Sequence, residues 1–238
     1  MDIKNRKAIV LGGTSGIGLA ATRQLEDAGA TVVAGSRNAE NIEIASASTG
    51  PSVSYRQVNT LDRDALAKLF QEEAPFDILV NSATGGARAS GPFLQMDLDA
   101  FQLSFRKLWG YTNSVRLGAE FLSNDGAIVL VSGFPARKSN PGSLAISTVG
   151  NAVEGFARAL APEIAPRRIN IVCPGLIDTP MFPQEGEQRK QFLANATSRT
   201  LIPRAGTADE VASAILFAIE NDYMTGSTID IEGGALLP

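Results

Sequence analysis

The sequence predicts an α/β protein in which helices cover both faces of a doubly wound parallel sheet of seven strands. Short apolar runs alternate with amphipathic helical stretches along all 238 residues. The runs are rich in valine and isoleucine, as expected for parallel strands buried on both faces. Each connection is long enough for a right-handed crossover. With 44% hydrophobic residues the chain can form one large core, so we expect a single domain over residues 1–238.

The expected strands are distributed along the whole chain. They are Ala8–Leu11, Thr31–Gly35, Val53–Val58, Ile78–Val80, Ala127–Val131, Ile169–Val172 and Thr228–Ile231. Glycine and proline mark the boundaries, since Gly29 ends the first helix and Pro75 precedes the fourth strand. The least regular stretch, residues 178–202, lies where a lid over a site is expected, although an ordinary surface excursion explains it equally well.

The composition excludes several classes of function. A net charge of −4 and a pI near 5.0 disfavour a nucleic-acid partner. The single cysteine, Cys173, forms no internal disulfide, and the lack of histidine removes imidazole as a base or metal ligand, so we expect no metal site. The first strand begins almost at Met1 and no apolar run reaches membrane-spanning length, so we expect a cytoplasmic protein without a membrane partner.

A glycine-rich segment joins the first expected strand to the first expected helix. Its glycines allow a tight turn, close approach of a pyrophosphate and packing of helix on strand, while N–H groups at the helix N-terminus face the anion. Such a turn often only caps a helix, but its place in a β-α-β unit predicts a Rossmann fold that binds a dinucleotide. The cofactor-binding residues expected here are Gly12, Thr14, Ser15, Gly16, Ile17 and Gly18.

The end of the second expected strand indicates which dinucleotide binds. An acidic residue commonly holds the ribose 2′-hydroxyl at this place, but this chain has Ser36-Arg37-Asn38. Arginine can pair bidentately with a 2′-phosphate and stack on adenine. We therefore expect NADP(H), bound partly by Ser36 and Arg37, although a solvated loop cation is the alternative interpretation of Arg37.

Two more motifs follow later strands. Asn81-Ser82-Ala83-Thr84 follows the fourth, and Pro174-Gly175 with Thr179 follows the sixth. Together with the glycine-rich segment, preceded by Leu11 where a threonine is usual, they resemble the short-chain dehydrogenase/reductase family over essentially the whole chain. The resemblance implies contacts to the nicotinamide carboxamide and to adenine. The cofactor-binding residues that it adds are Asn59, Thr60, Asn81, Ser82, Ala83, Pro174, Gly175, Ile177 and Thr179.

The catalytic residues of that family are missing. The resemblance places Gly133 at the serine position, Ile146 at the tyrosine, Gly150 at the lysine and Lys107 at the asparagine. In the family, the tyrosine protonates the alkoxide that hydride delivery creates, and isoleucine cannot. Because a positioned acid is worth a factor of about 10² to 10⁴ in rate, the site is slow, served by another acid, or no longer catalytic.

Lys107 is the strongest candidate for the replacement acid, because the resemblance places it on a helix that lines the site. Tyr111 lies one turn further, so the ammonium could lower the phenol pKa, or the ring could simply pack in the core. Ser132 leaves a hydroxyl next to the serine position, but it could instead satisfy backbone groups at the strand end. Arg137 and Asn151 are weaker candidates.

Two hypotheses follow from these residues. The first is an oxidoreductase that transfers hydride between the nicotinamide of NADP(H) and a small carbonyl or alcohol substrate, with a non-standard proton donor. The second is a non-catalytic module that senses or stores NADP(H). The resemblance also implies a homodimer or homotetramer. The apolar residues that suit either a subunit contact or the core are Leu103, Leu108, Val153, Phe156 and Leu160.

Overall fold

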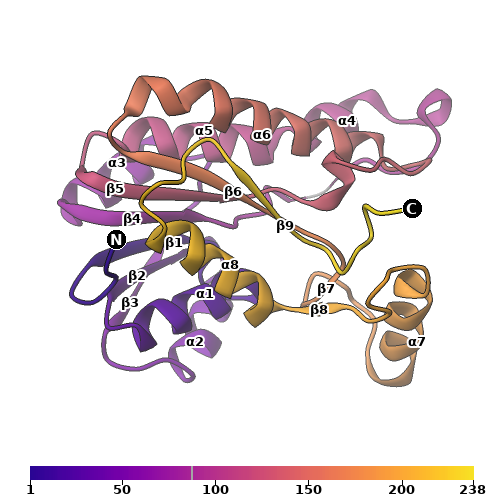
Figure 1. The fold of residues 1–238 in the computed structure, drawn as a ribbon, viewed down its shortest axis with the longest axis horizontal. Helices are drawn as coiled ribbons and strands as arrows, with labels where there is room; N and C mark the ends of the chain where they lie inside the picture. The colour runs from indigo at the N-terminus through magenta and orange to yellow at the C-terminus, as the bar shows by residue number, and fades with distance from the viewer. Residues whose placement is uncertain (87) are drawn as a thin grey trace.

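The computed structural model describes residues 1–86 and 88–238 and shows a parallel sheet between two layers of helices (Figure 1). The strand order is β3-β2-β1-β4-β5-β6-β9, with every neighbouring pair parallel. The predicted fold class and all seven predicted strands are confirmed, with shifts at their ends. The strands are β1 Lys7–Leu11, β2 Thr31–Ser36, β3 Val53–Gln57, β4 Phe76–Asn81, β5 Leu122–Val131, β6 Arg168–Pro174 and β9 Thr228–Ile231.

The two faces of the sheet carry separate cores because side chains alternate along each strand. In β1, Ala8 and Val10 belong to a core shared with α1 (Gly16–Asp27) and α8 (Ala208–Glu220). Ile9 and Leu11 belong to the opposite core, to which three helices contribute. Those helices are α3 Arg63–Glu72, α5 Arg106–Gly118 and α6 Leu144–Ile164. The apolar alternation within one strand thus decides which helix layer each side chain meets.

The remaining elements are short or lie at the edges. They are the helices α2 Ala39–Ser46, α4 Leu98–Ser104 and α7 Gly186–Thr197, the 3₁₀ turns η1 Phe93–Gln95 and η2 Phe134–Ala136, and the strands β7 Ile177–Asp178 and β8 Gly206–Thr207. Side-chain caps fix several helix starts, as where Asn38 accepts from the backbone N–H of Glu40 at 2.9 Å at the start of α2. A reciprocal capping box between Thr207 and Glu210 begins α8.

The irregular stretch of residues 178–202 contains α7 and is flanked by the paired strands β7 and β8, and all three elements lie beyond the end of the sheet in Figure 1. Of the apolar residues that suited either a core or a subunit contact, Val153 is fully buried and Leu103 is 42% exposed. Leu108, Phe156 and Leu160 pack partly against the core below α5 and α6. No helix in the described part of the chain combines the length and apolarity needed to cross a membrane.

Candidate active site

A cleft of about 860 Å³ opens where the sheet changes its winding direction. β1 pairs with β2 on one side and with β4 on the other, so the connections that follow β1 and β4 leave in different directions. Ligands of open α/β sheets bind in the crevice that such connections form. The predicted cofactor-binding residues that line the cleft are Gly12, Thr14, Ser15, Gly16, Ile17, Gly18, Ser36, Arg37, Asn59, Thr60, Ser82, Ala83 and Thr179.

The glycine-rich turn has the geometry that a diphosphate requires. Gly12 and Gly16 have φ of +81° and +50°, which side-chain-bearing residues rarely adopt. A Cβ on Gly18 would lie 2.0 Å from the Gly12 carbonyl oxygen, so only glycine allows this approach of helix and turn. Helix α1 has no side-chain cap and no acidic residue in its first turn. Its free N–H groups are therefore available to an anion in the cleft.

Arg37 lies at the end of β2, on the rim of the cleft. Its carbonyl oxygen accepts a hydrogen bond from the Gln57 side chain at 3.2 Å, which fixes the backbone. Its Nη1 lies 3.8 Å from the point where a Cβ on Gly86 would stand, so the guanidinium reaches towards the loop after β4. Arg37 forms no ion pair with any described residue and is free to meet a phosphate. The Asn59 side-chain oxygen accepts from the Leu61 N–H at 3.1 Å, which leaves one of its lone pairs for adenine.

Four predicted cofactor residues do not line the cleft. Asn81 is fully buried, donates to the Ser114 hydroxyl at 3.0 Å and accepts from the Ala83 N–H at 3.1 Å, so it shapes the turn after β4. The other three are Pro174 at the end of β6, Gly175 in the connection that follows, and Ile177 at the start of β7.

Gly175 packs closely against β9 and the residues after it. Its N–H donates to the Ile231 carbonyl at 2.9 Å, and a Cβ on it would lie 2.8 Å from the Glu232 Cα. In the stretch of residues 178–202, Thr179, Pro180 and Met181 line the cleft. A lid over the site requires such a contact where the stretch begins.

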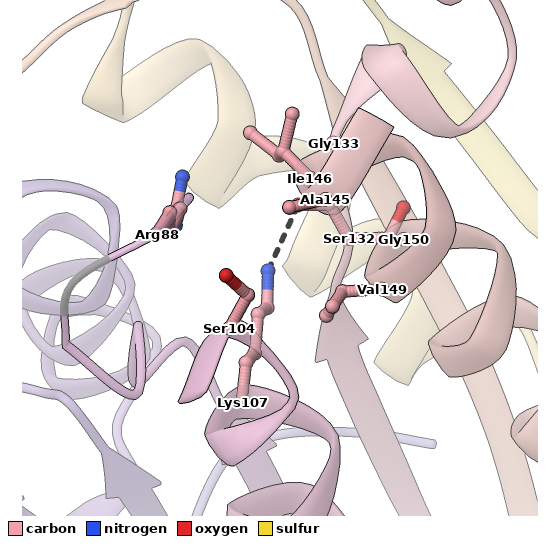
Figure 2. Close-up of a pocket in the computed structure, with 9 residues that line it drawn as sticks. All are labelled: Arg88, Ser104, Lys107, Ser132, Gly133, Ala145, Ile146, Val149 and Gly150. Atoms are coloured by element: carbon pink, nitrogen blue, oxygen red, sulfur yellow. Dashed lines mark hydrogen bonds between the residues drawn. The ribbon is translucent and has the colours of Figure 1, made fainter. Parts of the chain in front are cut away.

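A second, smaller cavity of about 30 Å³ lies between α4, α5 and α6 beside the cleft (Figure 2). Its lining residues are Arg88, Ser104, Lys107, Ser132, Gly133, Ala145, Ile146, Val149 and Gly150. The four positions that the resemblance equates with the family's catalytic residues, 107, 133, 146 and 150, are therefore brought together around one cavity. Arg88 lines both spaces and joins the cavity to the cleft.

Lys107 lies in the first turn of α5, with its ammonium at the wall of the cavity (Figure 2). Its Nζ donates to the Ser132 carbonyl at 3.2 Å. Burial, and to a lesser degree the positive charge of Arg88, lowers the pKa of Lys107 from 10.5 to about 7. The loop after β4 crosses this turn closely, since a Cβ on Gly85 would lie 2.6 Å from the Lys107 backbone nitrogen. The loop that lines the cleft is therefore packed against the helical turn that carries Lys107.

The expected role of Tyr111 is wrong in its electrostatics. The side chain is fully buried and lines neither the cleft nor the cavity. Its hydroxyl donates to the Val131 carbonyl at 2.9 Å, and burial raises its pKa, the opposite of the expected direction. The Lys107 Nζ lies 5.4 Å from the ring centroid, so the pair meets through the ring face rather than through the phenol oxygen.

Ser132 lines the cavity, but its hydroxyl already has a partner. It donates to the buried carboxylate of Glu154 on α6 at 3.2 Å. Glu154 also accepts from Arg137, at 3.1 Å, so Arg137 is directed to this carboxylate rather than into the cavity. The Asn151 side chain donates to the carbonyls of Ala136 and Ser147, at 2.8 and 2.9 Å. Neither Arg137 nor Asn151 lines the cavity.

Backbone packing distinguishes two of the positions that the resemblance equates with catalytic residues. A Cβ on Gly150 would lie 2.7 Å from the Ala136 Cβ, so the η2 turn occupies the start of any side chain at that position. Gly133, by contrast, has extended backbone with φ 173° and only one atom within 4 Å of its virtual Cβ, at 3.6 Å. Position 150, which the resemblance equates with the lysine, thus has no space for a side chain, whereas position 133, equated with the serine, has space for one.

Comparison with known proteins agrees with this geometry. The family model described as Enoyl-(Acyl carrier protein) reductase matches residues 12–235. A 3-oxoacyl-acyl-carrier-protein reductase FabG of Thermotoga maritima is 31% identical, with all of both chains covered. A small-chain dehydrogenase solved in complex with NADPH is 30% identical, with a TM-score of 0.84 and coverage of 99% of this chain and 100% of that one. This chain belongs to the short-chain dehydrogenase/reductase family.

A further solved relative carries a description of its catalytic centre. It is described as a short chain oxidoreductase from Pseudomonas aeruginosa PAO1 containing an atypical catalytic center. It is 28% identical, with a TM-score of 0.90 and coverage of 99% of this chain and 98% of that chain. That description applies to the relative, and its overall fold is shared with this chain.

Sequence reasoning missed Arg88 altogether. It lies in the glycine-rich loop after β4, where no periodicity or spacing gives a residue a predictable direction. The available signal was its distance of only seven residues from Asn81, on the same connection as a cofactor motif. Its contact with the second cavity depends on α4 and α6, which lie far along the chain.

Proposed function

We propose that this chain is an NADP(H)-dependent oxidoreductase that interconverts a small carbonyl compound and its alcohol, with Lys107 as the proton donor in place of tyrosine. The observation on which this proposal rests is the small cavity beside the cleft. Of the four family positions around it, 107 alone holds a side chain that can give or take a proton. Its pKa near 7 suits general acid–base work at neutral pH.

The cleft residues fit the phosphate groups of the cofactor. The N–H groups at the start of α1 can receive the diphosphate, and Arg37 can pair with a 2′-phosphate, which supports NADP(H) over NAD(H). The relative solved with NADPH supports the same choice. When bound, the cofactor supplies the hydride that carbonyl reduction needs. The chain itself then has to orient the carbonyl and provide one proton.

Lys107 can supply that proton. Its ammonium has three donors, and the Ser132 carbonyl takes one of them at 3.2 Å, so donors remain for a carbonyl oxygen in the cavity. The Ser132 hydroxyl, directed to Glu154, contributes by fixing the strand end whose carbonyl orients the lysine. The ring face of Tyr111 contacts the Lys107 ammonium through a cation–π interaction. We therefore assign the proton step to Lys107 and positioning to Ser132 and Tyr111.

The test is oxidation of NADPH by purified protein with a panel of ketones, aldehydes, quinones and enones. We expect turnover that falls by about 10²-fold or more in Lys107→Met, the loss typical of a positioned acid, while NADPH affinity stays within about threefold. Lys68→Met, which removes an exposed lysine on α3, is the matched control. Full turnover in Lys107→Met would refute the assignment of the acid.

A non-catalytic NADP(H) sensor is the second candidate, favoured by the closed lysine position at Gly150 and the apolar Ile146. Both functions require NADPH binding, so calorimetry comes first. Tight binding without oxidation across the panel, in wild type and in all variants, would support the sensor. Absence of heat with either coenzyme would contradict both candidates.

We further propose a homo-oligomer that uses the outer face of α4 and α5. Leu98, Leu103 and Trp109 are 68%, 42% and 55% exposed on these helices, an apolar surface that suits a subunit contact. Light scattering on size-exclusion fractions should give a dimer or tetramer mass, and Trp109→Glu should reduce it. A monomeric wild type would contradict the proposal.

A further inference from the structure

The small cavity contains an excess of positive charge. Arg88 and Lys107 both line it, and no acidic residue is among its lining residues. Neither cation forms an ion pair with any carboxylate in the described part of the chain. Figure 2 shows the two side chains projecting into the same space from the loop after β4 and from α5. Two like charges at one cavity wall, without a counter-charge, are costly unless a ligand compensates them.

Arg88 is presented from a fixed backbone. The N–H of Ala89 donates to the buried Ser104 hydroxyl at 2.9 Å, and that hydroxyl donates in turn to the Ala100 carbonyl at 2.9 Å. Gly91 is joined to the loop before α6 by a 3.0 Å hydrogen bond from its N–H to the Gly142 carbonyl. Ser104 is therefore occupied in holding the loop, and Arg88 is the group left to face a ligand.

Two other arginines near the sheet show how the chain satisfies a guanidinium that is buried or partly buried. Arg168 donates to the carbonyls of Ala218 and Asn221, at 2.9 and 3.0 Å. Arg137 is paired with Glu154 at 3.1 Å. Arg88 has no such hydrogen bond among the described residues, although burial lowers its pKa. Unlike these two arginines, Arg88 therefore presents its guanidinium to the cavity without a hydrogen-bond partner among the described residues.

We infer that the substrate is an oxo acid, or the corresponding hydroxy acid, whose carboxylate binds Arg88 while its carbonyl oxygen meets the Lys107 ammonium. The inference rests on the proposed function and names the substrate class of the same site. A carboxylate matches the planar fork of arginine with two parallel hydrogen bonds. One water occupies about 10–15 Å³ by the same kind of measure, so a cavity of about 30 Å³ suits a group as small as a carboxylate.

The reduction balances with these groups. The carbonyl carbon gains a C–H bond by accepting hydride from NADPH, which becomes NADP⁺, and the π pair of the C=O bond moves to oxygen. That oxygen takes a proton from Lys107, and water restores the lysine proton. The carboxylate is unchanged and serves only to place the carbonyl. The overall change is oxo acid plus NADPH plus H⁺ to hydroxy acid plus NADP⁺.

The experiment compares each acid with its own methyl ester at saturating NADPH. The pairs are 2-oxobutyrate, acetoacetate and levulinate with their methyl esters, which vary the distance between the two groups. We expect kcat/KM to favour at least one acid over its ester by more than tenfold. In Arg88→Gln the ratio of acid to ester should fall by about 10- to 100-fold, the range for a lost charged hydrogen bond. Arg88→Lys should fall in between.

Arg106→Gln is the matched control, because Arg106 is exposed, adjoins Lys107 in sequence and does not line the cavity. It should leave the ratio of acid to ester within about threefold. Equal use of acid and ester, or an equal loss for both in Arg88→Gln, would overturn the inference. So would a loss confined to NADPH affinity, since Arg88 also lines the cleft and would then be a cofactor ligand.

A binding measurement separates this inference from the proposed function. If no carbonyl compound is reduced, malonate is titrated calorimetrically into the NADPH complex of each variant. Malonate binding that weakens by tenfold or more in Arg88→Gln, but not in Arg106→Gln, would support an anion site without turnover. No binding of malonate to the wild-type complex, or equal binding to all variants, would overturn it.

Discussion

Replacing Lys107 with methionine should stabilise the folded protein, and by an amount that depends on pH. Methionine keeps most of the volume of the side chain and removes its charge. The folded pKa of Lys107, about 7, lies below the ordinary value of 10.5. Between these values the unfolded chain binds more protons than the folded one, so the free energy of unfolding of the wild type rises with pH. The penalty is complete below about pH 7 and lost above about pH 10.5.

The size of the effect follows from the same two values. A pKa lowered from 10.5 to about 7 corresponds to about 5 kcal/mol, which is an upper limit. Lys107 keeps part of its surface exposed to the cavity and retains its hydrogen bond to the Ser132 carbonyl, so water and this bond reduce the cost of charge. We expect Lys107→Met to gain about 2 to 4 kcal/mol near pH 6.5, and the gain to shrink by about 2 to 3 kcal/mol near pH 9.5.

The assay is urea unfolding of wild type and variant without coenzyme, at fixed protein concentration and at both pH values. Lys68→Met, which removes an exposed lysine on α3, should change stability by less than about 0.5 kcal/mol at either pH. A variant that is less stable than wild type by the same amount at both pH values would refute the reasoning. It would mean that Lys107 is charged throughout and contributes to stability through its hydrogen bond.

Three further predictions concern the same region. Arg37→Asp should weaken NADPH binding by about 10²-fold and NADH binding far less, and an unchanged preference would remove the 2′-phosphate contact. The kcat/KM for carbonyl reduction should fall tenfold per pH unit above about pH 7 as Lys107 loses its proton, whereas that for alcohol oxidation, which needs the neutral amine, should rise up to about pH 7 and level off above it; a reduction rate independent of pH above 7 would exclude lysine as the acid. Gly150→Ala should destabilise by about 1 to 3 kcal/mol because its Cβ would lie 2.7 Å from that of Ala136, whereas Gly133→Ala should be tolerated, as thermal melting can check.

The fold was predictable because its signals are local. The central strands are rich in Val, Ile and Leu, and each is covered on both faces, which is the cause of this composition. The two-residue strands β7 and β8 were missed, since two residues show no period and their pairing joins Ile177 to Gly206 across α7. The glycine-rich turn was predictable for a similar reason, because strand, turn and helix are consecutive in the sequence.

The smaller cavity was only partly predictable, because several distant elements build it. Spacing placed Lys107 and Tyr111 on one face of α5, but it could not show that the phenol points into the core towards the Val131 carbonyl. Nor could it show that the hydroxyl of Ser132 turns to Glu154. The position of Arg88 at the cavity could not be predicted for the same reason, since it depends on which helices surround the loop after β4.

The residues around the cavity depend on one another, so we expect that a tyrosine at position 146 or a lysine at position 150 alone would not create the chemistry that the resemblance implies for those positions. Ile146 and Val149 exclude polar partners from one wall, so burial lowers the pKa of Lys107 towards neutrality. A lysine at Gly150 would meet the η2 turn before it reached the cavity, and a tyrosine at position 146 would then lack the ammonium that acidifies it. The proposed function therefore depends on the ammonium of Lys107 on α5, because the η2 turn leaves no space for a second ammonium at position 150.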